Sequence, residues 1–91
     1  MGRAHRSRPN RLGEKLRLIR IQLGLTQSQL IAVLAVKGEA LYPSSISLFE
    51  QNEREPSLLV LLAYSNLSGV IINDLVDDKV RPAELSIKQS R

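Results

Sequence analysis

The sequence contains no cysteine and a single histidine, His5, among its 91 residues. Without cysteine there is no disulfide framework and no thiolate metal site, and one histidine in a polar segment is a poor ligand set. We therefore expect no metal and no cofactor. The sequence also lacks a run of about eighteen apolar residues, and no apolar signal core follows its charged N-terminus. We expect an intracellular, cytoplasmic protein with no membrane association.

Catalytic residue sets are missing as well. There is no Ser-His-Asp combination and no Gly-rich phosphate loop. The neighbouring carboxylates Glu53/Glu55 and Asp77/Asp78 lie in polar, turn-like segments, where solvated surface positions are expected in place of acid–base chemistry. The length suits one small domain, without room for a second ligand-sensing or catalytic domain. We expect a protein that is not an enzyme.

Positive charge is concentrated at the N-terminus. The first twenty residues contain seven basic residues and only Glu14 as an acidic one, although the whole chain has a net charge of +4. The basic residues are Arg3, Arg6, Arg8, Arg11, Lys15, Arg17 and Arg20. Such a gradient suits a polyanionic partner, because neutralised phosphates release counterions. Arg3, Arg6, Arg8 and Arg11 are candidate contacts to DNA from a flexible basic arm; the alternative is a solvated tail.

Apolar residues recur at helical spacing along most of the chain, and no strand pattern occurs. Leu12, Leu16, Ile19 and Leu23, for example, share one face of a helix. The pattern predicts an all-α fold with five helices, at residues 11–23, 26–34, 44–51, 57–67 and 71–76. We divide the chain into an arm (1–11), a helical domain (12–78) and a C-terminal tail (79–91).

The segment LGLTQ, beginning at Leu23, predicts a turn between two helices. Gly24 ends the first helix, Thr26 begins the second as its N-cap residue, and Gln27 stands in the first turn. Backbone N–H groups at such a helix start attract anions. In a basic protein the expected anion is a phosphate.

Four segments match, in order, the pattern of a known family. They are LGEKLRLIRIQLGLTQSQLI from Leu12, SSISLFEQN from Ser44, REPSLLVLL from Arg54 and GVIINDLV from Gly69. The chain resembles the Cro/repressor-type (XRE-like) helix-turn-helix domains over residues 12–78. The resemblance implies a five-helix lambda-repressor-like domain that binds double-stranded DNA as a homodimer, with the third helix in the major groove. It also implies a transcriptional regulator, with repression as the expected activity.

The third helix would read the bases, and its outward face is unusual. Matching it to the family places Pro43, Ser44, Ser47 and Leu48 outward, with no Arg, Lys, Asn or Gln for a bidentate base contact. We therefore expect modest base readout helped by DNA shape. The predicted DNA-binding residues are Thr26, Gln27, Ser44, Ser45, Ser47, Leu48, Gln51, Asn52 and Arg54. For Ser44 and Ser45, N-capping after Pro43 is the alternative role.

Arg20 and Glu50 lie among apolar neighbours, where a lone charge is costly. In the family the matching residues form an internal ion pair, so we expect one here. The pair either orients the third helix for DNA or only satisfies two buried polar groups.

The fourth helix carries more apolar residues than one core face requires. With Leu58, Leu61, Leu62 and Ser65 assigned to the core, an outer set remains, and an exposed apolar stripe of this kind indicates a partner surface. The predicted dimer interface is Leu59, Val60, Ala63 and Leu67. The alternative is a helix buried against the tail at residues 82–87.

The connection between the second and third helices is longer than in the family. Either the second helix extends through Val36, or residues 35–43 form a surface loop. Lys37 and Tyr42 contact DNA if this loop projects toward it; if not, Leu41 and Tyr42 cover the core, which we favour.

Two other functions remain open. The apolar fourth helix suits an antitoxin-like or other protein-interaction module with a protein partner. The poor base-reading face of the third helix suits a nonspecific DNA-binding protein.

Overall fold

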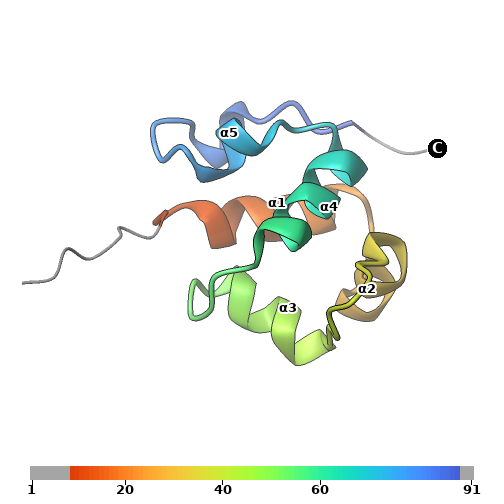
Figure 1. Cartoon of the computed structure of the whole chain (residues 1–91). Coiled ribbons are helices and arrows are strands. Elements are labelled where there is room, and N and C mark those ends of the chain that lie inside the picture. Colours follow the sequence, from red (N-terminus) through yellow and green to blue (C-terminus); the bar gives the residue numbers. More distant parts are fainter. Residues whose placement is uncertain (1–8, 89–91) are drawn as a thin grey trace, which may run out of the picture.

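The computed structural model describes residues 9–88 and is all-helical over that range, with no strand (Figure 1). The prediction of an all-α fold is confirmed. The helices are α1 (Leu12–Gln22), α2 (Gln27–Leu34), α3 (Pro43–Glu50), α4 (Leu58–Ser68) and α5 (Ile72–Val76), followed by a 3-10 turn η1 (Pro82–Glu84). Each α-helix lies within two residues of its predicted bounds. The predicted arm residues Arg3, Arg6 and Arg8 lie outside the described range.

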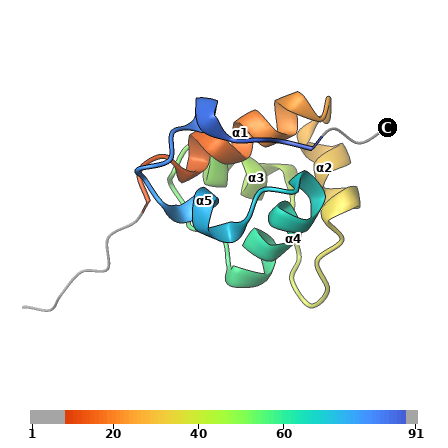
Figure 2. The ribbon, with the colours of Figure 1, turned by 90° about the horizontal axis from the view of Figure 1, so that it is seen from above.

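The helices surround one apolar core. In Figure 1, α1 runs across the middle of the molecule, with α3 on one side and α5 on the other, and Figure 2 shows α4 covering a further side. Every α-helix contributes at least one buried apolar side chain. The fully buried ones include Leu16, Ile19, Leu30, Ile46, Phe49, Val60, Tyr64 and Leu75. In α3 the buried residues are Ser45, Ile46 and Phe49.

The buried face of α4 differs from the prediction. Leu58 and Leu62 were assigned to the core, yet their side chains are 68% and 43% exposed. Val60, Tyr64 and Ser68 are buried in their place, and Leu61 is buried as predicted. Because the first six residues of α4 are all apolar, hydrophobicity alone does not select its inner face, and the large Tyr64 ring is among the side chains that are fully buried. Val33 of α2 is also exposed, at 48%.

Residues 79–88 extend the folded unit beyond the predicted boundary at residue 78. Leu85 and Ile87 pack against the core, η1 lies against α1, and the Lys88 N–H donates to the Ser68 carbonyl at 2.7 Å. This segment does not cover the outer face of α4, because Leu58 and Leu59 remain exposed. The alternative of a fourth helix buried against the tail is therefore wrong.

Lys15 and Asp78 join α1 to the α5 region. The Lys15 side chain, predicted to serve the basic gradient, is fully buried, and its ammonium donates to the carbonyls of Asp74, Leu75 and Asp77 at the end of α5. Burial lowers the pKa of Lys15, although the nearby carboxylates oppose this shift. In the opposite direction, the Asp78 carboxylate accepts from the N–H groups of Asn10 and Arg11 at 2.9 and 3.0 Å. Each helix thus has one terminus capped by a residue distant in sequence.

Gly13 allows α1 to approach the end of α3 closely. A Cβ atom at this position would lie 2.6 Å from the Glu50 carbonyl oxygen and 2.8 Å from that of Phe49. The Gly13 N–H donates to the Asn52 side-chain oxygen at 2.9 Å, and the Asn52 amide donates to the Asn10 carbonyl at 2.9 Å. The α1–α3 contact therefore depends on a residue without a side chain.

We predict that Gly13→Ala destabilises the protein. Alanine is normally the better helix former, by up to about 1 kcal/mol, but here its methyl group collides with backbone oxygens. We expect a loss of about 1–3 kcal/mol in thermal unfolding followed by circular dichroism. Arg17→Ala, at an exposed position of the same helix, is the control. An unfolding temperature for Gly13→Ala at or above the wild-type value would contradict the close approach.

We also predict that Asp78 contributes a pH-dependent part of the stability. Hydrogen bonds from the N–H groups of Asn10 and Arg11 lower the pKa of Asp78 below its usual value of about 3.9. The stabilisation is therefore complete above that usual value and is lost as the pH falls through the lowered pKa. Asp78→Asn should be less stable at neutral pH and should show a weaker loss of stability below about pH 4. Acid titration of both proteins under mild urea measures this; identical profiles would refute the role.

Candidate nucleic-acid interface

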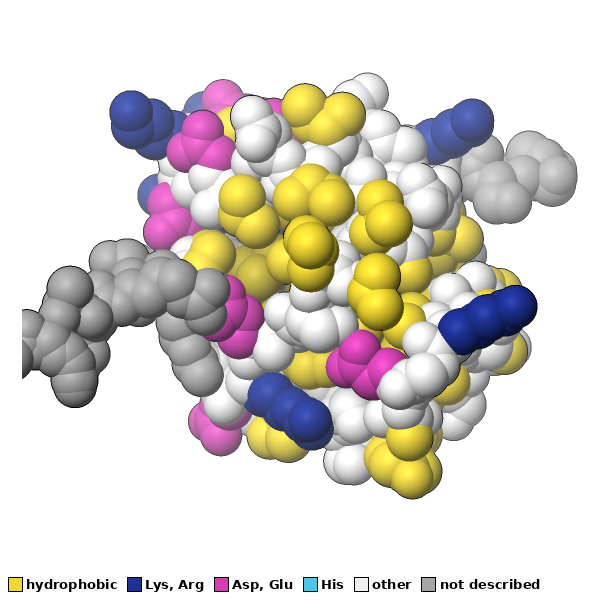
Figure 3. Space-filling model, in the orientation of Figure 1, with side chains coloured by type: hydrophobic (Ala, Val, Ile, Leu, Met, Phe, Trp, Pro, Cys, Tyr) yellow, Lys and Arg dark blue, Asp and Glu magenta, His cyan; other side chains and the backbone are white. Residues whose placement is uncertain are grey.

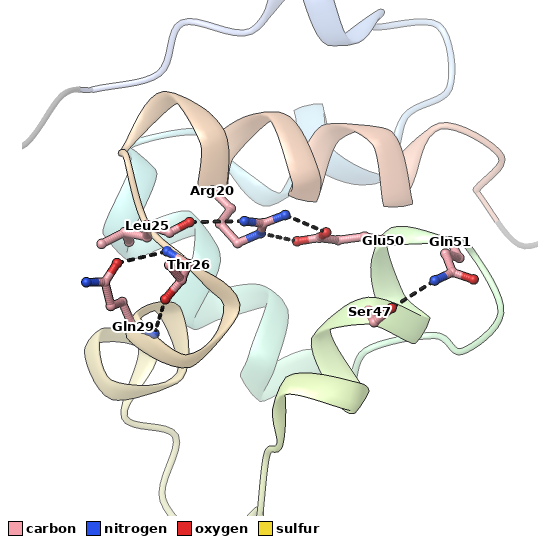
Figure 4. A network of polar contacts seen from close by, with 7 residues as sticks. All are labelled: Arg20, Leu25, Thr26, Gln29, Ser47, Glu50 and Gln51. Atoms are coloured by element: carbon pink, nitrogen blue, oxygen red, sulfur yellow. Dashed lines mark hydrogen bonds and ion pairs between the residues drawn. The ribbon is translucent and has the colours of Figure 1, made fainter.

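The turn between α1 and α2 is held by a reciprocal cap (Figure 4). Gly24 has a φ of 71°, and the Thr26 hydroxyl accepts from the Gln29 N–H at 3.1 Å, while the Gln29 side-chain oxygen accepts from the Thr26 N–H at 2.9 Å. Thr26 is the N-cap residue of α2, as predicted. The role of Gln29 was not predicted, although the T-x-x-Q spacing is the signal of a capping box.

The cap leaves the first amides of α2 available. Within residues 9–88, the N–H groups of Gln27 and Ser28 make no hydrogen bond, and both residues stand at the start of the helix. The Gln27 side chain is half-buried there and Ser28 is exposed. Unpaired N–H groups at a helix start carry a partial positive charge. This end of α2 can therefore receive an anion.

Arg20 and Glu50 form the predicted ion pair (Figure 4). The contact is bidentate, with Arg20 Nε 2.7 Å from Glu50 Oε2 and Nη2 3.1 Å from Oε1. The third guanidinium nitrogen donates to the Leu25 carbonyl at 3.0 Å, so one side chain joins α1, the α1–α2 turn and α3. The hydrogen bond to Glu50 raises the pKa of Arg20. The two side chains are only 15% and 5% exposed, which makes the pair part of the framework rather than a contact surface.

A buried hydroxyl lies close to this pair. Tyr64 is fully buried, and within the described part of the chain its hydroxyl has no hydrogen-bond partner. Burial raises the pKa of Tyr64, with a further contribution from the Glu50 charge. The phenol therefore remains neutral, and Tyr64 serves the core through its ring.

The outward face of α3 is short and mostly uncharged. Ser44 and Gln51 are exposed, and Ser47 and Leu48 are half-buried. The Gln51 amide donates to the Ser47 hydroxyl at 2.8 Å, so these two residues form one polar unit (Figure 4). This pairing was not predicted, although residues four apart on a helix are neighbours.

Two residues predicted to contact DNA, Ser45 and Asn52, have side chains that bond to backbone groups of the domain. Ser45 is only 4% exposed on the inner face of α3, and its hydroxyl accepts from the Tyr42 N–H at 3.2 Å, so the prediction of a DNA contact is wrong. It serves the helix start, the alternative role considered for it. Asn52 has a left-handed backbone, with a φ of 60°, and its side chain bonds the backbone of Asn10 and Gly13. We assign Asn52 to the framework.

Arg54 lies just beyond α3 and is exposed. Its guanidinium carbon is 6.0 Å from the centre of the Phe49 ring. Arg11, the one predicted arm residue within the described range, is half-buried at the start of α1. Arg11 thus directly precedes α1 and Arg54 follows α3, and Arg54 is the more exposed of the two.

The long α2–α3 connection is a surface loop. Helix α2 ends at Leu34, and Ala35 and Gly38 take positive φ values of 46° and 79°. Leu41 packs against the core as predicted, but Tyr42 is 61% exposed, so its predicted covering role is wrong. Figure 2 shows the loop projecting beside α4. The Ser57 hydroxyl, at the start of α4, donates to the Glu39 carboxylate at 2.7 Å and attaches the loop to that helix.

The predicted dimer stripe is only partly exposed. Leu59 is exposed and Ala63 is half-buried, but Val60 is fully buried and Leu67 packs against the core. Val60 is therefore a core residue and its predicted interface role is wrong. The exposed side of α4 is instead formed by Leu58, Leu59 and Leu62, which we call the leucine ridge.

We predict that the Arg20–Glu50 pair is required as a pair. Glu50→Leu leaves a buried guanidinium without its partner and should cost about 3–5 kcal/mol, whereas Arg20→Met with Glu50→Leu should recover most of the loss. Urea unfolding of the two single variants and the double variant forms a mutant cycle that measures the coupling. Single-variant losses below about 1 kcal/mol would show a pair of the exposed, weakly coupled kind.

Comparison with models of protein families, with curated proteins and with solved structures finds no match to this chain. Across residues 9–88, no three His, Cys, Asp or Glu residues are grouped to hold a metal ion, and no helix there has the length and apolarity to cross a membrane. The membership of the XRE-like family stays a prediction based on the four sequence segments.

Proposed function

We propose that this protein is a non-enzymatic, DNA-binding transcriptional regulator, a repressor, with a lambda-repressor-like helix-turn-helix domain. Two copies would place their α3 helices in successive major grooves of double-stranded DNA. The observation that carries the proposal is the position of α3. A buried bidentate ion pair fixes α3 beside a helix start with two unpaired amides, while the outer side of α3 stays accessible.

Phosphates would be held at the start of α2 and beyond the end of α3. The Gln27 and Ser28 amides offer donors at the start of α2, and the Gln27 side chain adds another. Arg54 offers an exposed guanidinium beyond the end of α3. Contacts of this kind set orientation and register but carry no sequence information.

Base recognition would rest on three residues of α3 and on Gln51, which directly follows it. Ser44, Ser47 and Gln51 can donate and accept, and Leu48 can meet a thymine methyl group. The Ser47–Gln51 hydrogen bond holds the Gln51 amide in place, so it approaches the groove with less freedom to lose. Without an arginine on this face, a strong guanine contact is missing, and groove shape would supply part of the preference. The basic N-terminal residues would add affinity that does not depend on sequence.

The leucine ridge supports a second candidate function, an antitoxin-like or other protein-interaction module. Three leucines of one helix exposed to solvent are unusual in a small monomer. If the protein is such a module, α3 and the start of α2 would not bind DNA. A nonspecific DNA-binding role would instead keep the affinity and lose the preference among sequences.

We predict that two classes of substitution separate phosphate contacts from base contacts. Gln27→Ala should lower affinity for all duplexes about equally, whereas Ser47→Ala and Leu48→Ala should change the order of preference by about 1–3 kcal/mol per altered base pair. Selection from a random duplex library followed by sequencing measures both effects. Ser86→Ala, an exposed serine beyond η1, is the matched control.

Each outcome assigns the protein to one function. If Gln27→Ala changed only which DNA sequence is preferred, the proposed docking orientation would be wrong. Binding without sequence preference, unaffected by Ser47→Ala and Leu48→Ala, would indicate the nonspecific role. No binding to any duplex at low salt would indicate the protein-interaction module.

A further inference from the structure

A groove runs between helix α4 and the long α2–α3 loop. Figure 3 shows hydrophobic side chains gathered over α4, and Figure 2 shows the loop standing beside this helix. The groove, which we call the loop groove, has a volume of about 230 Å³. Its walls are residues 34–37 on one side and Leu59, Leu62, Ala63 and Asn66 on the other. The groove is therefore mostly apolar, and Lys37 is its single charged residue.

Contacts at both ends hold the wall formed by the loop. Leu34, the last residue of α2, is buried in the core, and the Ser57 hydroxyl donates to the Glu39 carboxylate at 2.7 Å. Because Ser57 is the N-cap residue of α4, the loop runs from the end of α2 toward the start of α4. The loop groove is thus formed by the protein alone, as sites for small molecules usually are.

The ammonium group of Lys37 is free to meet a ligand. Within residues 9–88 it takes part in no ion pair and no hydrogen bond, and the side chain is exposed. Glu39, the only acidic residue of the loop, is occupied by Ser57. The α4 wall extends from Leu59 to Asn66, about 10 Å along the helix. A slot of this length, apolar but with one cation, matches an aliphatic chain with an anionic head group.

We propose that the loop groove binds a small aliphatic carboxylate, with the chain along α4 and the carboxylate at Lys37. Removing the chain from water supplies most of the affinity, up to about a fourfold factor for each buried methylene group. The exposed Lys37 adds less, since a solvated ion pair is weak, but it selects the sign of the head group. Asn66, the remaining polar residue of the α4 wall, is uncharged and does not oppose the carboxylate.

A ligand in this groove would act on α3, and this step alone rests on the proposed function. Residues 35–42 connect α2 to α3, and the first of them belong to the groove wall. A ligand that contacts both this segment and α4 favours the loop position seen here, with α3 in its present place. The carboxylate and DNA should therefore strengthen each other's binding by the same factor.

Octanoate below its micelle concentration is the probe for the site. Titration of methyl-labelled protein, followed by nuclear magnetic resonance, should shift the methyl signals of Leu59, Leu62 and Ala63 saturably. We expect a dissociation constant on the order of 1 mM. Affinity should rise about two- to fourfold for each methylene added between hexanoate and octanoate. The methyl groups of Ile71, an equally exposed residue outside the groove, are the internal control.

Two variants test the two parts of the groove. Lys37→Gln should weaken octanoate binding about two- to fivefold and leave the binding of octanol unchanged. Lys79→Gln, an exposed lysine outside the groove, is the matched control. Leu59→Gln should weaken both octanoate and octanol, because it removes part of the apolar wall. Since the Leu59 side chain is 56% exposed, folding should survive this change, and circular dichroism checks that it does.

The same experiments define what overturns the site. Equal shifts at Leu59 and Ile71, or equal octanoate affinities of Lys37→Gln and Lys79→Gln, would overturn it. Groove signals that shift with protein concentration but not with octanoate would also overturn it, and would assign the groove to a second copy of the chain.

Fluorescence anisotropy with a labelled duplex separates the regulatory step from the proposed function. Saturating octanoate should raise the affinity for the preferred duplex about fivefold or more, and Leu59→Gln should abolish this response. Duplex affinity that does not change with bound octanoate would overturn the regulatory step alone. Binding of octanoate as predicted, without binding to any duplex, would refute the DNA-binding function and leave the ligand site established.

Discussion

The bidentate contact between Arg20 and Glu50 is the interaction on which the arrangement of the helices depends. Helix α3 has only eight residues, too few to be stable alone in water. Its C-terminal end is held by Glu50 on Arg20, by the close approach of Gly13 and by the Asn52 side chain. Since Arg20 also binds the Leu25 carbonyl, the same side chain positions the start of α2. Both surfaces proposed to meet DNA are therefore set by one residue of α1.

Helix α5 and the residues after it are fixed by a second, independent contact. Lys15 closes the end of α5 from within α1, and Asp78 closes the start of α1 from beyond α5. Helix α1 thereby connects the α3 surface to the side of the molecule that carries α5 and the leucine ridge.

Local patterns predicted most of the fold. Helix limits followed from apolar spacing, from the Thr26 cap and from Gly24, because these signals act within a few residues. The orientation of α4 was not predictable in this way, since its first six residues are all apolar and favour no face until the neighbouring helices are placed. The roles of Lys15 and Asp78 also escaped prediction, because their partners lie more than 50 positions away in the sequence.

The candidate site was likewise predicted only in part from the sequence. Arg20 and Glu50 were found through the family resemblance, and the structure confirms their contact. Ser45 and Asn52 were taken for DNA contacts because both stand at the ends of α3, where the sequence does not separate a helix cap from a surface contact. In three dimensions Ser45 is buried, and the Asn52 side chain is bonded to the backbone of Asn10 and Gly13.

The central claim is that α3 and the start of α2 form the DNA-binding surface. Nuclear magnetic resonance of ¹⁵N-labelled protein titrated with a short duplex tests it most directly, because each backbone amide reports separately. The account predicts that the largest shifts occur at Gln27, Ser28 and the exposed positions of α3, and that the exposed amides near η1 do not respond. Shifts confined to α4 and α5, or none at all in low salt, would contradict it.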